Sequence, residues 1–409
     1  MEVRNPPKIV GGPLQWRVAV AVAEKNRVYQ IAVLVETDNS WGRSVVEGIA
    51  DYASKFGSWN LLIDPRDQSQ GWSLPDRWHG DGIIARVSTP LHLEEIARAG
   101  LPAVNVDNVF ENQEGVGQVT TDEHAWAAMA LDHFRERGFV HFAYFAPPSH
   151  EYSKKGAQAF FAAVTDEGYD CHVYRPGYRG GRRIGRDEEY NRVLRWLNHL
   201  PKPVAILAVD ARRGRQLTEI CSLERIRVPD EVAILAGDTD EFLCNLSSPP
   251  LSSISVASQR IGHEAAALLD RMMSGEPAPS EPALIPPVRI VGKQSTDVLA
   301  IEDPMIVQAL RYIQSHAFRG IGVEDVLREV PVSRRYLELQ FKRRIGRLPA
   351  EEIRRLRLER GRDLLSQSDL SVESIAAACG YAGATQFGVA FRKHFGNTPL
   401  AFRRRLTRS

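Results

Sequence analysis

The sequence has few of the features that mark secreted, membrane or metal-binding proteins. Its 409 residues include only four cysteines, and these show no disulfide or zinc-ribbon spacing: Cys171, Cys221, Cys244 and Cys379. Every apolar run is short and soon interrupted by charge, so none is long enough to cross a bilayer. The N-terminus has an apolar patch but lacks the basic start, apolar core and cleavage site of a secretion signal. These absences predict a cytoplasmic chain with no metal site and no membrane partner.

Motifs of the common enzyme chemistries are also missing. There is no G-x-S-x-G elbow, no phosphate-binding loop and no H-E-x-x-H motif. Gly115 and Gly117 form only a fragment of a dinucleotide fingerprint, since the third glycine is absent. Carboxylates in a cleft can do general acid–base chemistry, but nothing in the sequence places two of them at a defined separation. We therefore expect no catalytic residue, no cofactor and no enzymatic activity.

Charge is distributed unevenly along the chain. Residues 302–409 contain 20 Lys and Arg against 12 Asp and Glu, whereas the remainder contains 32 against 39. The net charge of +1 therefore combines an acidic front with a basic back. This asymmetry suggests that only the back meets a polyanion. Because solvated charge runs are common, the observation by itself favours nucleic acid only weakly.

The front two-thirds alternates short apolar runs with amphipathic ones. "QIAVLVE" (30–36) is typical of a buried strand, and the next segment places Val45, Val46, Ile49 and Ala53 on one helical face. Strands separated by helices of this length predict parallel sheets with right-handed crossovers. Roughly 270 residues of this pattern exceed one comfortable doubly wound domain. We expect a bilobed α/β fold with two parallel-sheet lobes and a cleft between them.

Charged side chains follow several of these strands at their carboxyl ends, where such folds bind ligands. They are Asp38, Arg86, Asp107, Asp210 and Asp238, and Trp41 lies beside the first of them. For any one Asp, turn or helix-capping chemistry is a sufficient explanation. The set as a whole favours a polar ligand site. A sugar fits it, because Asp and Arg bond hydroxyl groups while an aromatic face packs on the C–H side of the ring.

The C-terminal region contains the same pattern twice. "FKRRIGRLP" (341–349) is repeated as "FRKHFGNTP" (391–399), and the similarity extends upstream through 323–330 and 372–379. Two apolar stripes with i, i+4, i+8 spacing correspond: Leu337, Phe341 and Ile345, and Phe387, Phe391 and Phe395. Each copy predicts a short helix, a turn and a second helix with a basic end, which is helix-turn-helix geometry. An amphipathic helix between them carries Ile353, Leu356, Leu364 and Leu365 to join the two halves.

This geometry assigns roles to exposed side chains of the two second helices. Arg334, Arg335 and Glu338 have the donors and acceptors that read guanine and cytosine edges, and Thr385 suits a thymine methyl. Lys342, Arg343, Arg392 and Lys393 are expected to bind phosphates. The predicted DNA-binding set comprises Ser333, Arg334, Arg335, Glu338, Lys342 and Arg343 in the first unit, and Ala384, Thr385, Gly388, Arg392 and Lys393 in the second.

Residues 302–409 resemble the DNA-binding domain of the AraC/XylS family. The signature is a long one: Gly380-Tyr381, Phe387, Phe391-Arg392-Lys393, Phe395-Gly396-Asn397-Thr398-Pro399 and Phe402-Arg403. The front resembles the LacI/GalR sugar-sensing core, with "VTTDEHAWAAMALDHFRERGF", "VPDEVAILAGDTD" and "LIPPVRIVGKQST" in the expected order.

The resemblance implies a periplasmic-binding-protein-like sensor followed by an all-α double helix-turn-helix domain. It implies a homodimer paired through the sensor lobes that binds double-stranded DNA half-sites. It further implies a pentose effector, D-xylose or a related sugar, and contact with RNA polymerase if the regulator is an activator. The implied effector positions are Asp38, Trp41, Arg86, Asp122, Asp210, Arg212 and Asp238. We expect a leader at 1–28 (disordered, or the product of an upstream start codon), a sensor at 29–297, a linker at 298–303 and the DNA-binding domain at 304–409.

Departures from the family pattern keep other interpretations open. Gly156 stands where LacI-type cores carry a sugar-binding Arg, Arg86 stands where a xylose sensor has an acid, and Val389 replaces a common base-reading Arg. Another pentose, a hexose or a sugar acid is therefore an alternative effector. An enzyme with a DNA-targeting domain is an alternative of a different class, and so is a binding protein whose basic tail serves only solubility.

Overall fold

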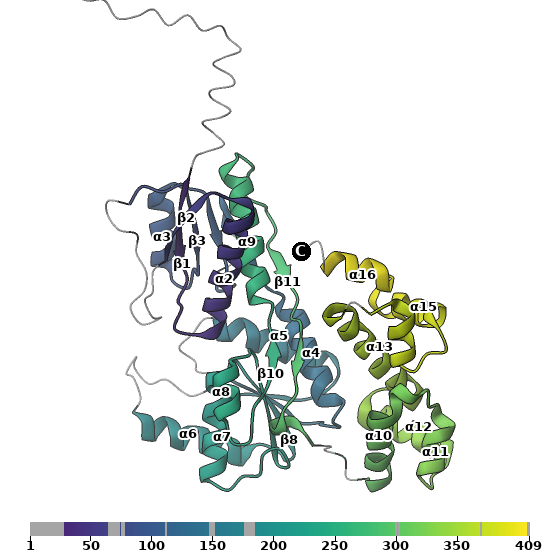
Figure 1. The fold of residues 1–409 in the computed structure, drawn as a ribbon. Helices are drawn as coiled ribbons and strands as arrows, with labels where there is room; N and C mark the ends of the chain where they lie inside the picture. The colour runs from purple at the N-terminus through teal and green to yellow at the C-terminus, as the bar shows by residue number, and fades with distance from the viewer. Residues whose placement is uncertain are drawn as a thin grey trace, which may run out of the picture.

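The computed structural model describes residues 28–63, 74, 78–110, 113–146, 152–175, 185–298, 301, 303–368 and 370–406. Two lobes, each built on one sheet, are followed by a separate group of helices, shown in yellow-green in Figure 1. Apart from Val28, the leader predicted at 1–28 lies outside the described residues. Within the described part of the chain, no helix is long and apolar enough to cross a membrane.

The first lobe contains a parallel sheet of six strands in the order β11-β5-β4-β3-β1-β2. The strands are β1 (Tyr29–Leu34), β2 (Trp59–Ile63), β3 (Gly82–Ala85), β4 (Ala103–Asn105), β5 (Val116–Thr121) and β11 (Ala283–Ile285). The helices of this lobe are α2 (Ser40–Phe56), α3 (Pro90–Ala99) and α9 (Ser258–Met273). Helices α2 and α9 pack closely through Gly48 and Gly262, because a Cβ at either position would collide with a backbone carbonyl of the other helix.

The second lobe repeats this plan with the order β12-β10-β9-β8-β6-β7. Its strands are β6 (Phe142–Phe145), β7 (Cys171–Val173), β8 (Val204–Ala208), β9 (Val232–Ala236), β10 (Ser252–Ser255) and β12 (Arg289–Val291), of which β12 is antiparallel to β10. Its helices are α4 (Glu123–Arg135), α5 (Tyr152–Asp166), α6 (Arg186–His199), α7 (Ala211–Leu223) and α8 (Glu241–Leu246). The predicted bilobed α/β fold is confirmed.

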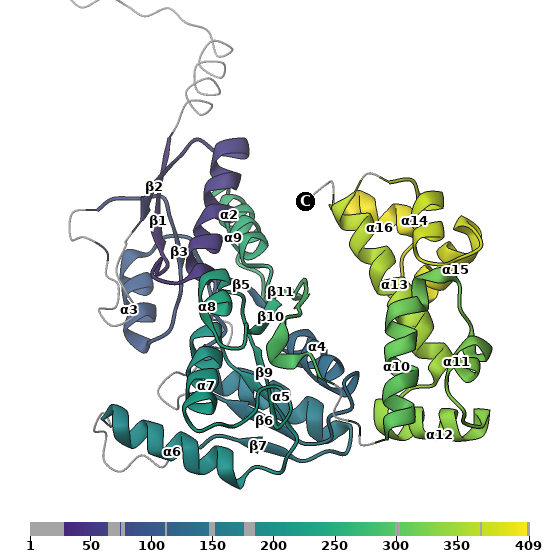
Figure 2. The ribbon, with the colours of Figure 1, turned by 60° about the horizontal axis from the view of Figure 1, so that its bottom comes forward.

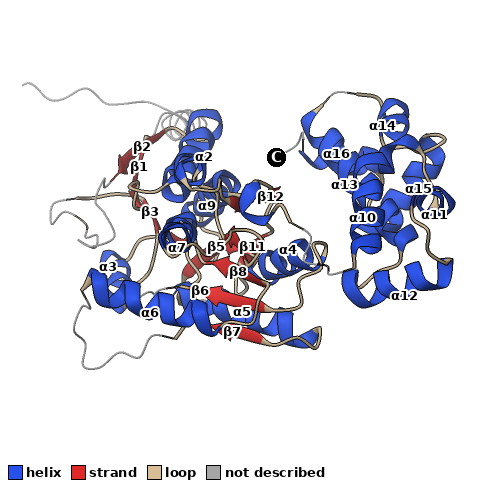
Figure 3. Ribbon diagram, turned by 90° about the horizontal axis from the view of Figure 1, so that it is seen from below, coloured by secondary structure: helices blue, strands red, loops and turns tan. Residues whose placement is uncertain are grey.

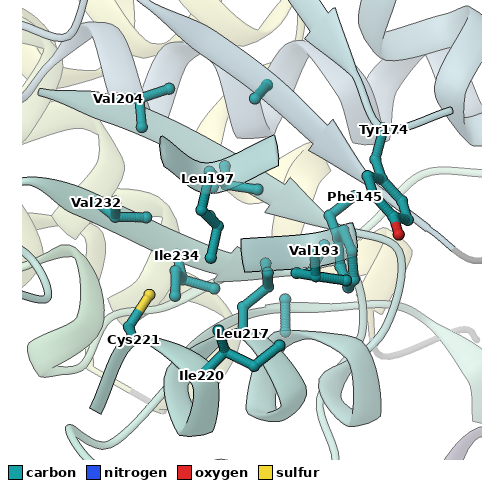
Figure 4. Close-up of a cluster of buried hydrophobic side chains, with 14 of the residues drawn as sticks. Phe145, Tyr174, Val193, Leu197, Val204, Leu217, Ile220, Cys221, Val232 and Ile234 are labelled. Atoms are coloured by element: carbon teal, nitrogen blue, oxygen red, sulfur yellow. The ribbon is translucent and has the colours of Figure 1, made fainter. Parts of the chain in front are cut away.

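Helices cover both faces of each sheet, so the central strands are buried on both sides (Figure 3). Strand β8 shows the consequence, since its five residues are all buried. Alternate side chains point to opposite faces: Val204 and Ile206 join the apolar cluster of Figure 4, and Ala205 and Leu207 join the cluster on the other face. This explains why these strands read as continuous apolar runs in the sequence.

The chain crosses between the lobes at three points, from β5 to α4, from β10 to α9 and from β11 to β12. The 3₁₀ turn η1 (Gln294–Thr296) ends the second lobe. The carboxyl ends of β1, β3 and β4 in one lobe and of β8 and β9 in the other lead to residues that line a shared cavity. The fold thereby brings together most of the charged strand-end residues singled out from the sequence.

The C-terminal helices form a domain of their own, which we call the reader domain (Figure 2). Its elements are α10 (Pro304–His316), η2 (Ala317–Arg319), α11 (Val323–Glu329), α12 (Arg334–Ile345), α13 (Pro349–Gln367), α14 (Val372–Ala378), α15 (Ala384–Phe395) and α16 (Pro399–Leu406). Helices α11 and α14 start 49 residues apart, and helices α12 and α15 start 50 residues apart, as the repeat predicts. Helices α12 and α15 both end at a glycine with positive φ, 78° at Gly346 and 75° at Gly396.

Helix α13 joins the two halves of the reader domain, as its sequence pattern predicts. Ile353 and Leu356 pack into the apolar cluster of the first unit. Leu364 and Leu365 pack into the cluster of the second unit. Because one helix contributes to both cores, the two second helices are held at a fixed separation.

Candidate functional site

A cavity of about 520 Å³ is lined by residues of both lobes of the sensor, a size that suits a small ligand. Six of the seven predicted effector positions line it: Asp38, Trp41, Arg86, Asp210, Arg212 and Asp238. The seventh, Asp122, is the N-cap of helix α4, where its carboxylate accepts a hydrogen bond from the Ala125 amide at 3.0 Å. Asp122 is not among the residues that line the cavity, which include its neighbours Thr121 and Glu123 instead.

Arg86, at the end of β3, is held between carboxylates of neighbouring strands. Its Nε lies 2.6 Å from Asp107 Oδ2, and its Nη1 lies 3.6 Å from Glu36 Oε2. Its guanidinium carbon lies 5.1 Å from the centre of the Trp41 ring, within the range of a cation–π contact. Desolvation raises the pKa of Glu36, and the charge of Arg86 opposes that shift. Two acidic groups thus compensate Arg86, which is only 9% exposed.

Asp210 and Asp238 follow β8 and β9 in the second lobe. Asp210 caps helix α7 by accepting from the Arg213 amide at 2.7 Å, and Asp238 accepts from the Ala211 amide at 2.7 Å. Desolvation raises the pKa of Asp238 to about 7, and the neighbouring charge of Asp210 adds to the shift. The pair presents carboxylate oxygens to the cavity, where they can accept hydrogen bonds from hydroxyl groups.

Asn108, Glu123 and Trp126 are among the lining residues that the sequence reasoning missed. Asn108 Nδ2 donates to Glu123 Oε1 at 2.6 Å, and desolvation raises the pKa of Glu123 to about 7. Trp126 is buried and its indole Nε1 donates to the carbonyl of Gly237 at 2.7 Å, which ties α4 to the end of β9. Their positions in the sequence could have identified two of them, because Asn108 directly follows the strand-end residue Asp107 and Glu123 follows the N-cap of α4.

Gly156, which the sequence comparison placed at a sugar-binding Arg position, lies on α5 and lines the cavity. A Cβ at this position would approach the Tyr144 hydroxyl to 2.8 Å. The described lining contains six carboxylates and four guanidinium groups: Asp38, Asp107, Glu123, Asp210, Asp238 and Asp240, and Arg43, Arg86, Arg212 and Arg213. This excess of acid, with Arg86 already compensated, disfavours an anionic ligand.

The first helix-turn-helix unit presents polar groups at the start of α12. Arg334 Nη1 lies 2.6 Å from Glu324 Oε1 and its Nε lies 3.0 Å from Glu338 Oε1, yet the Arg334 side chain is 55% exposed. Arg335 is exposed beside them. Ser333 is the N-cap of α12 and accepts from the Tyr336 amide at 3.2 Å. At the other end of the helix, Lys342 and Arg343 are exposed. These side chains are therefore accessible to a ligand, and their division into base-reading and phosphate-binding groups stays a prediction.

The second unit presents a different surface at the start of α15. Thr385, Arg392 and Lys393 are exposed, while Ala384 and Gly388 are half-buried. Val389, which replaces the common family Arg, has 67% of its surface exposed. Gln386 was missed by the sequence reasoning, although it is exposed on the same helix and accepts from the Ala382 amide at 3.2 Å. This helix offers small and apolar groups where α12 offers charged ones.

Among the described residues, no group of three or more His, Cys, Asp and Glu side chains could hold a metal ion. A two-lobed sensor with an interlobe cavity, joined to a double helix-turn-helix domain, defines a ligand-responsive transcription regulator. Comparison with known proteins gives the same division. Residues 30–124 match a XylR N-terminal domain, residues 131–296 a periplasmic binding protein-like domain, and residues 326–405 a helix-turn-helix domain.

Relatives cover nearly the whole chain. The xylose operon regulatory protein of Escherichia coli K12 is 31% identical over 382 residues, which are 92% of this chain and 97% of that protein. The protein of the same name from Haemophilus influenzae is 30% identical over 92% of this chain and 98% of its own length. A solved structure of a xylose-binding transcription activator is 31% identical, covers 92% of this chain and 98% of its own, and has a TM-score of 0.59. The chain belongs to the family of xylose operon regulatory proteins.

These findings confirm the predicted family resemblance and the predicted fold class. They also confirm that the chain belongs to a class of transcription regulators and not to a class of enzymes. A LacI-type regulator from a Rhodococcus species, 18% identical with a TM-score of 0.55, shares the fold over 67% of this chain.

Proposed function

We propose that this chain is a cytoplasmic activator of a pentose-utilisation operon that responds to D-xylose or a closely related neutral sugar. The choice of a neutral effector rests on Arg86, whose charge is balanced by neighbouring carboxylates. An arginine already paired with Asp107 and Glu36 has little charge left for the carboxylate of a sugar acid. The names of the two relatives and the description of the solved structure support xylose and activation.

In this proposal, Asp38, Asp210, Arg212 and Asp238 bond the hydroxyl groups of the sugar, and Trp41 packs on its C–H face. Glu123 and Asn108 add further polar contacts, and Asp122 acts indirectly by fixing the start of α4. The sensor extends over 29–297 and the reader domain over 304–409, with a linker between them.

Two helices with different exposed side chains, α12 and α15, bind each DNA half-site. Arg334, Arg335 and Glu338 of α12 read base edges by hydrogen bonding, and Thr385 with the Val389 side chain contacts thymine methyl groups from α15. Lys342, Arg343, Arg392 and Lys393 bind phosphates. The regulator acts as a homodimer on paired half-sites and contacts RNA polymerase. Sedimentation equilibrium of the purified protein tests the dimer, and transcription from a reconstituted promoter with and without sugar tests activation.

Titration calorimetry against a panel of pentoses, hexoses and uronic acids tests the effector, with Asp238→Ala as the matched variant. We expect micromolar binding of D-xylose and a loss of about 100-fold in Asp238→Ala, because hydrogen bonds to a charged group are worth about 1.5–3 kcal/mol each. Binding of a uronic acid without binding of any neutral sugar would contradict the role assigned to Arg86. Heat from no member of the panel would contradict the sugar effector itself.

A further inference from the structure

Helix α4 connects the effector cavity to the reader domain. Glu123, its first residue, and Trp126, one turn later, line the cavity. Glu136, which follows its last residue, forms ion pairs with the reader domain. The helix has 13 residues, so the two contacts are about 20 Å apart along its axis. In Figures 1 to 3, α4 lies on the side of the sensor that faces the reader helices.

The contact at the far end of α4 is a group of four charged side chains, which we call the interdomain ion cluster: Glu136, Arg347, Glu352 and Arg355. Glu136 Oε1 lies 2.8 Å from Arg355 Nη1 and 3.5 Å from Arg347 Nη1. On the reader side, Glu352 Oε1 lies 2.9 Å from Arg355 Nη2, and its Oε2 lies 3.3 Å from Arg347 Nη1. None of the four side chains is more than 19% exposed. Such a shielded arrangement depends strongly on geometry, because removing one partner leaves a buried charge without compensation.

A second contact lies beside the cluster. The guanidinium of Arg135, the last residue of α4, packs against Gly346, where any Cβ would collide with it. Gly346 ends α12 with a φ of 78° and is followed by Arg347 of the cluster. The sensor therefore holds the turn that directly follows the first base-reading helix. A shift of this turn relative to the sensor reorients α12.

The body of α4 is packed into the core of the second lobe, and its first turn is capped. Ala127, Ala130 and Phe134 are buried in a single apolar cluster of the second lobe, and Asp122 caps the first turn. At the cavity end, the Trp126 indole is bonded to the carbonyl of Gly237, the residue before Asp238. A ligand that contacts Asp238 or Glu123 therefore acts directly on the contacts that hold the start of this helix.

We propose that α4 is the element that transmits occupancy of the cavity to the reader domain, through the interdomain ion cluster. The proposal rests on the proposed function in one respect, that the cavity binds a sugar effector. Occupancy shifts α4 at its Glu123 end, and the displacement of Glu136 changes the orientation in which Arg347 and Arg355 hold the reader domain. The effector drives this change only to the extent that it binds one arrangement more tightly than the other.

The test compares the full chain with Glu136→Gln and with Asp132→Asn. Asp132 is an exposed carboxylate one turn earlier on the same helix, so its variant controls for loss of an acid from α4. For each protein, calorimetry gives the affinity for D-xylose, and fluorescence anisotropy gives the affinity for a DNA site selected in vitro, with and without the sugar. Arg347→Gln removes one of the two ion pairs of Glu136 from the reader side and serves as a second variant if Glu136→Gln folds poorly.

We expect Glu136→Gln and Arg347→Gln to bind sugar within about twofold of the wild type. The ratio of DNA affinities with and without sugar should fall from about fivefold or more to near one. Asp132→Asn should keep the wild-type ratio. A wild-type ratio in Glu136→Gln, together with normal sugar binding, would overturn the proposal.

A ligand-free measurement separates this proposal from the proposed function. Small-angle scattering without sugar should show a larger radius of gyration for Glu136→Gln than for the wild type and Asp132→Asn, because the reader domain is released from the sensor. If the wild type binds no sugar but this expansion is seen, the effector assignment fails and the cluster remains the contact that holds the reader. Identical scattering of all three proteins would show that the cluster does not hold the reader domain.

Discussion

The effector cavity and the DNA-reading surface use the same pair of residue types in opposite ways. In the cavity, Arg86 lies between Asp107 and Glu36 and is only 9% exposed. On the reader, Arg334 lies between Glu324 and Glu338 with a side chain that is 55% exposed. An exposed ion pair contributes little and exchanges partners easily, whereas a shielded pair is costly to break. Arg86 is therefore part of the architecture of the pocket, and Arg334 is available to DNA.

The largest expected effect is on stability. Arg86→Met should lower the free energy of unfolding by about 3–5 kcal/mol, because it leaves two shielded carboxylates facing each other. Arg334→Met should change it by less than about 0.5 kcal/mol. Urea denaturation followed by circular dichroism measures both. Equal losses in the two variants would remove the distinction between the two arginines.

The next effect is on DNA binding and separates the two kinds of basic residue on α12. Arg335→Ala should cost about 1–3 kcal/mol on a selected site and relax the preference for one base pair. Lys342→Ala should weaken binding to all sequences alike and reduce the slope of log K against log salt by about 0.9. Anisotropy titrations over a salt series, on the selected site and on point variants of it, measure both. If Lys342→Ala changes sequence preference and Arg335→Ala does not, the assigned roles are reversed.

The smallest effect concerns pH and again distinguishes the two regions. The pKa values of Asp238 and Glu123 are raised to about 7 by desolvation, whereas the pKa of half-buried Asp325 on α11 is lowered by the Gly322 amide that it accepts from. Between about pH 4 and 7, the folded sensor holds protons that the unfolded chain has released, so its stability falls as pH rises through this window. Asp325 contributes in the opposite sense, since its stabilisation is lost only as pH falls below its ordinary pKa.

Scanning calorimetry at pH 5.5 and 7.5 should therefore give a higher melting temperature for the sensor at the lower pH. The double variant Asp238→Asn, Glu123→Gln should lose part of this difference, and Asp325→Asn should leave it unchanged. A double variant that keeps the whole wild-type difference in melting temperature would contradict the raised pKa values of Asp238 and Glu123.

Local pattern was sufficient to predict much of the fold. Alternation of apolar and amphipathic runs predicts the two lobes because each strand and helix is set by nearby residues, and Val45, Ile49 and Ala53 are buried on α2 as their spacing indicates. The doubled motif predicts the reader domain for the same reason. Its second helices begin at Arg334 and Ala384, within the segments that the repeat defines.

Contacts between distant segments could not be read from the sequence. Asp122 and Asp238 are both acids after a strand, and only the fold shows that the second lines the cavity while the first does not. The pairing of Arg86 depends on three neighbouring strands. Glu136 and Arg355 are separated by more than 200 residues, and no local pattern links them.

One measurement tests most directly whether sugar binding and DNA binding are coupled in this chain. The affinity of the full chain for its selected DNA site is measured with and without saturating D-xylose, and the affinity for D-xylose is measured with and without that DNA. We predict that each ligand changes the affinity for the other by the same factor, about fivefold or more, because coupling is reciprocal. Two affinities that do not depend on the other ligand would contradict it.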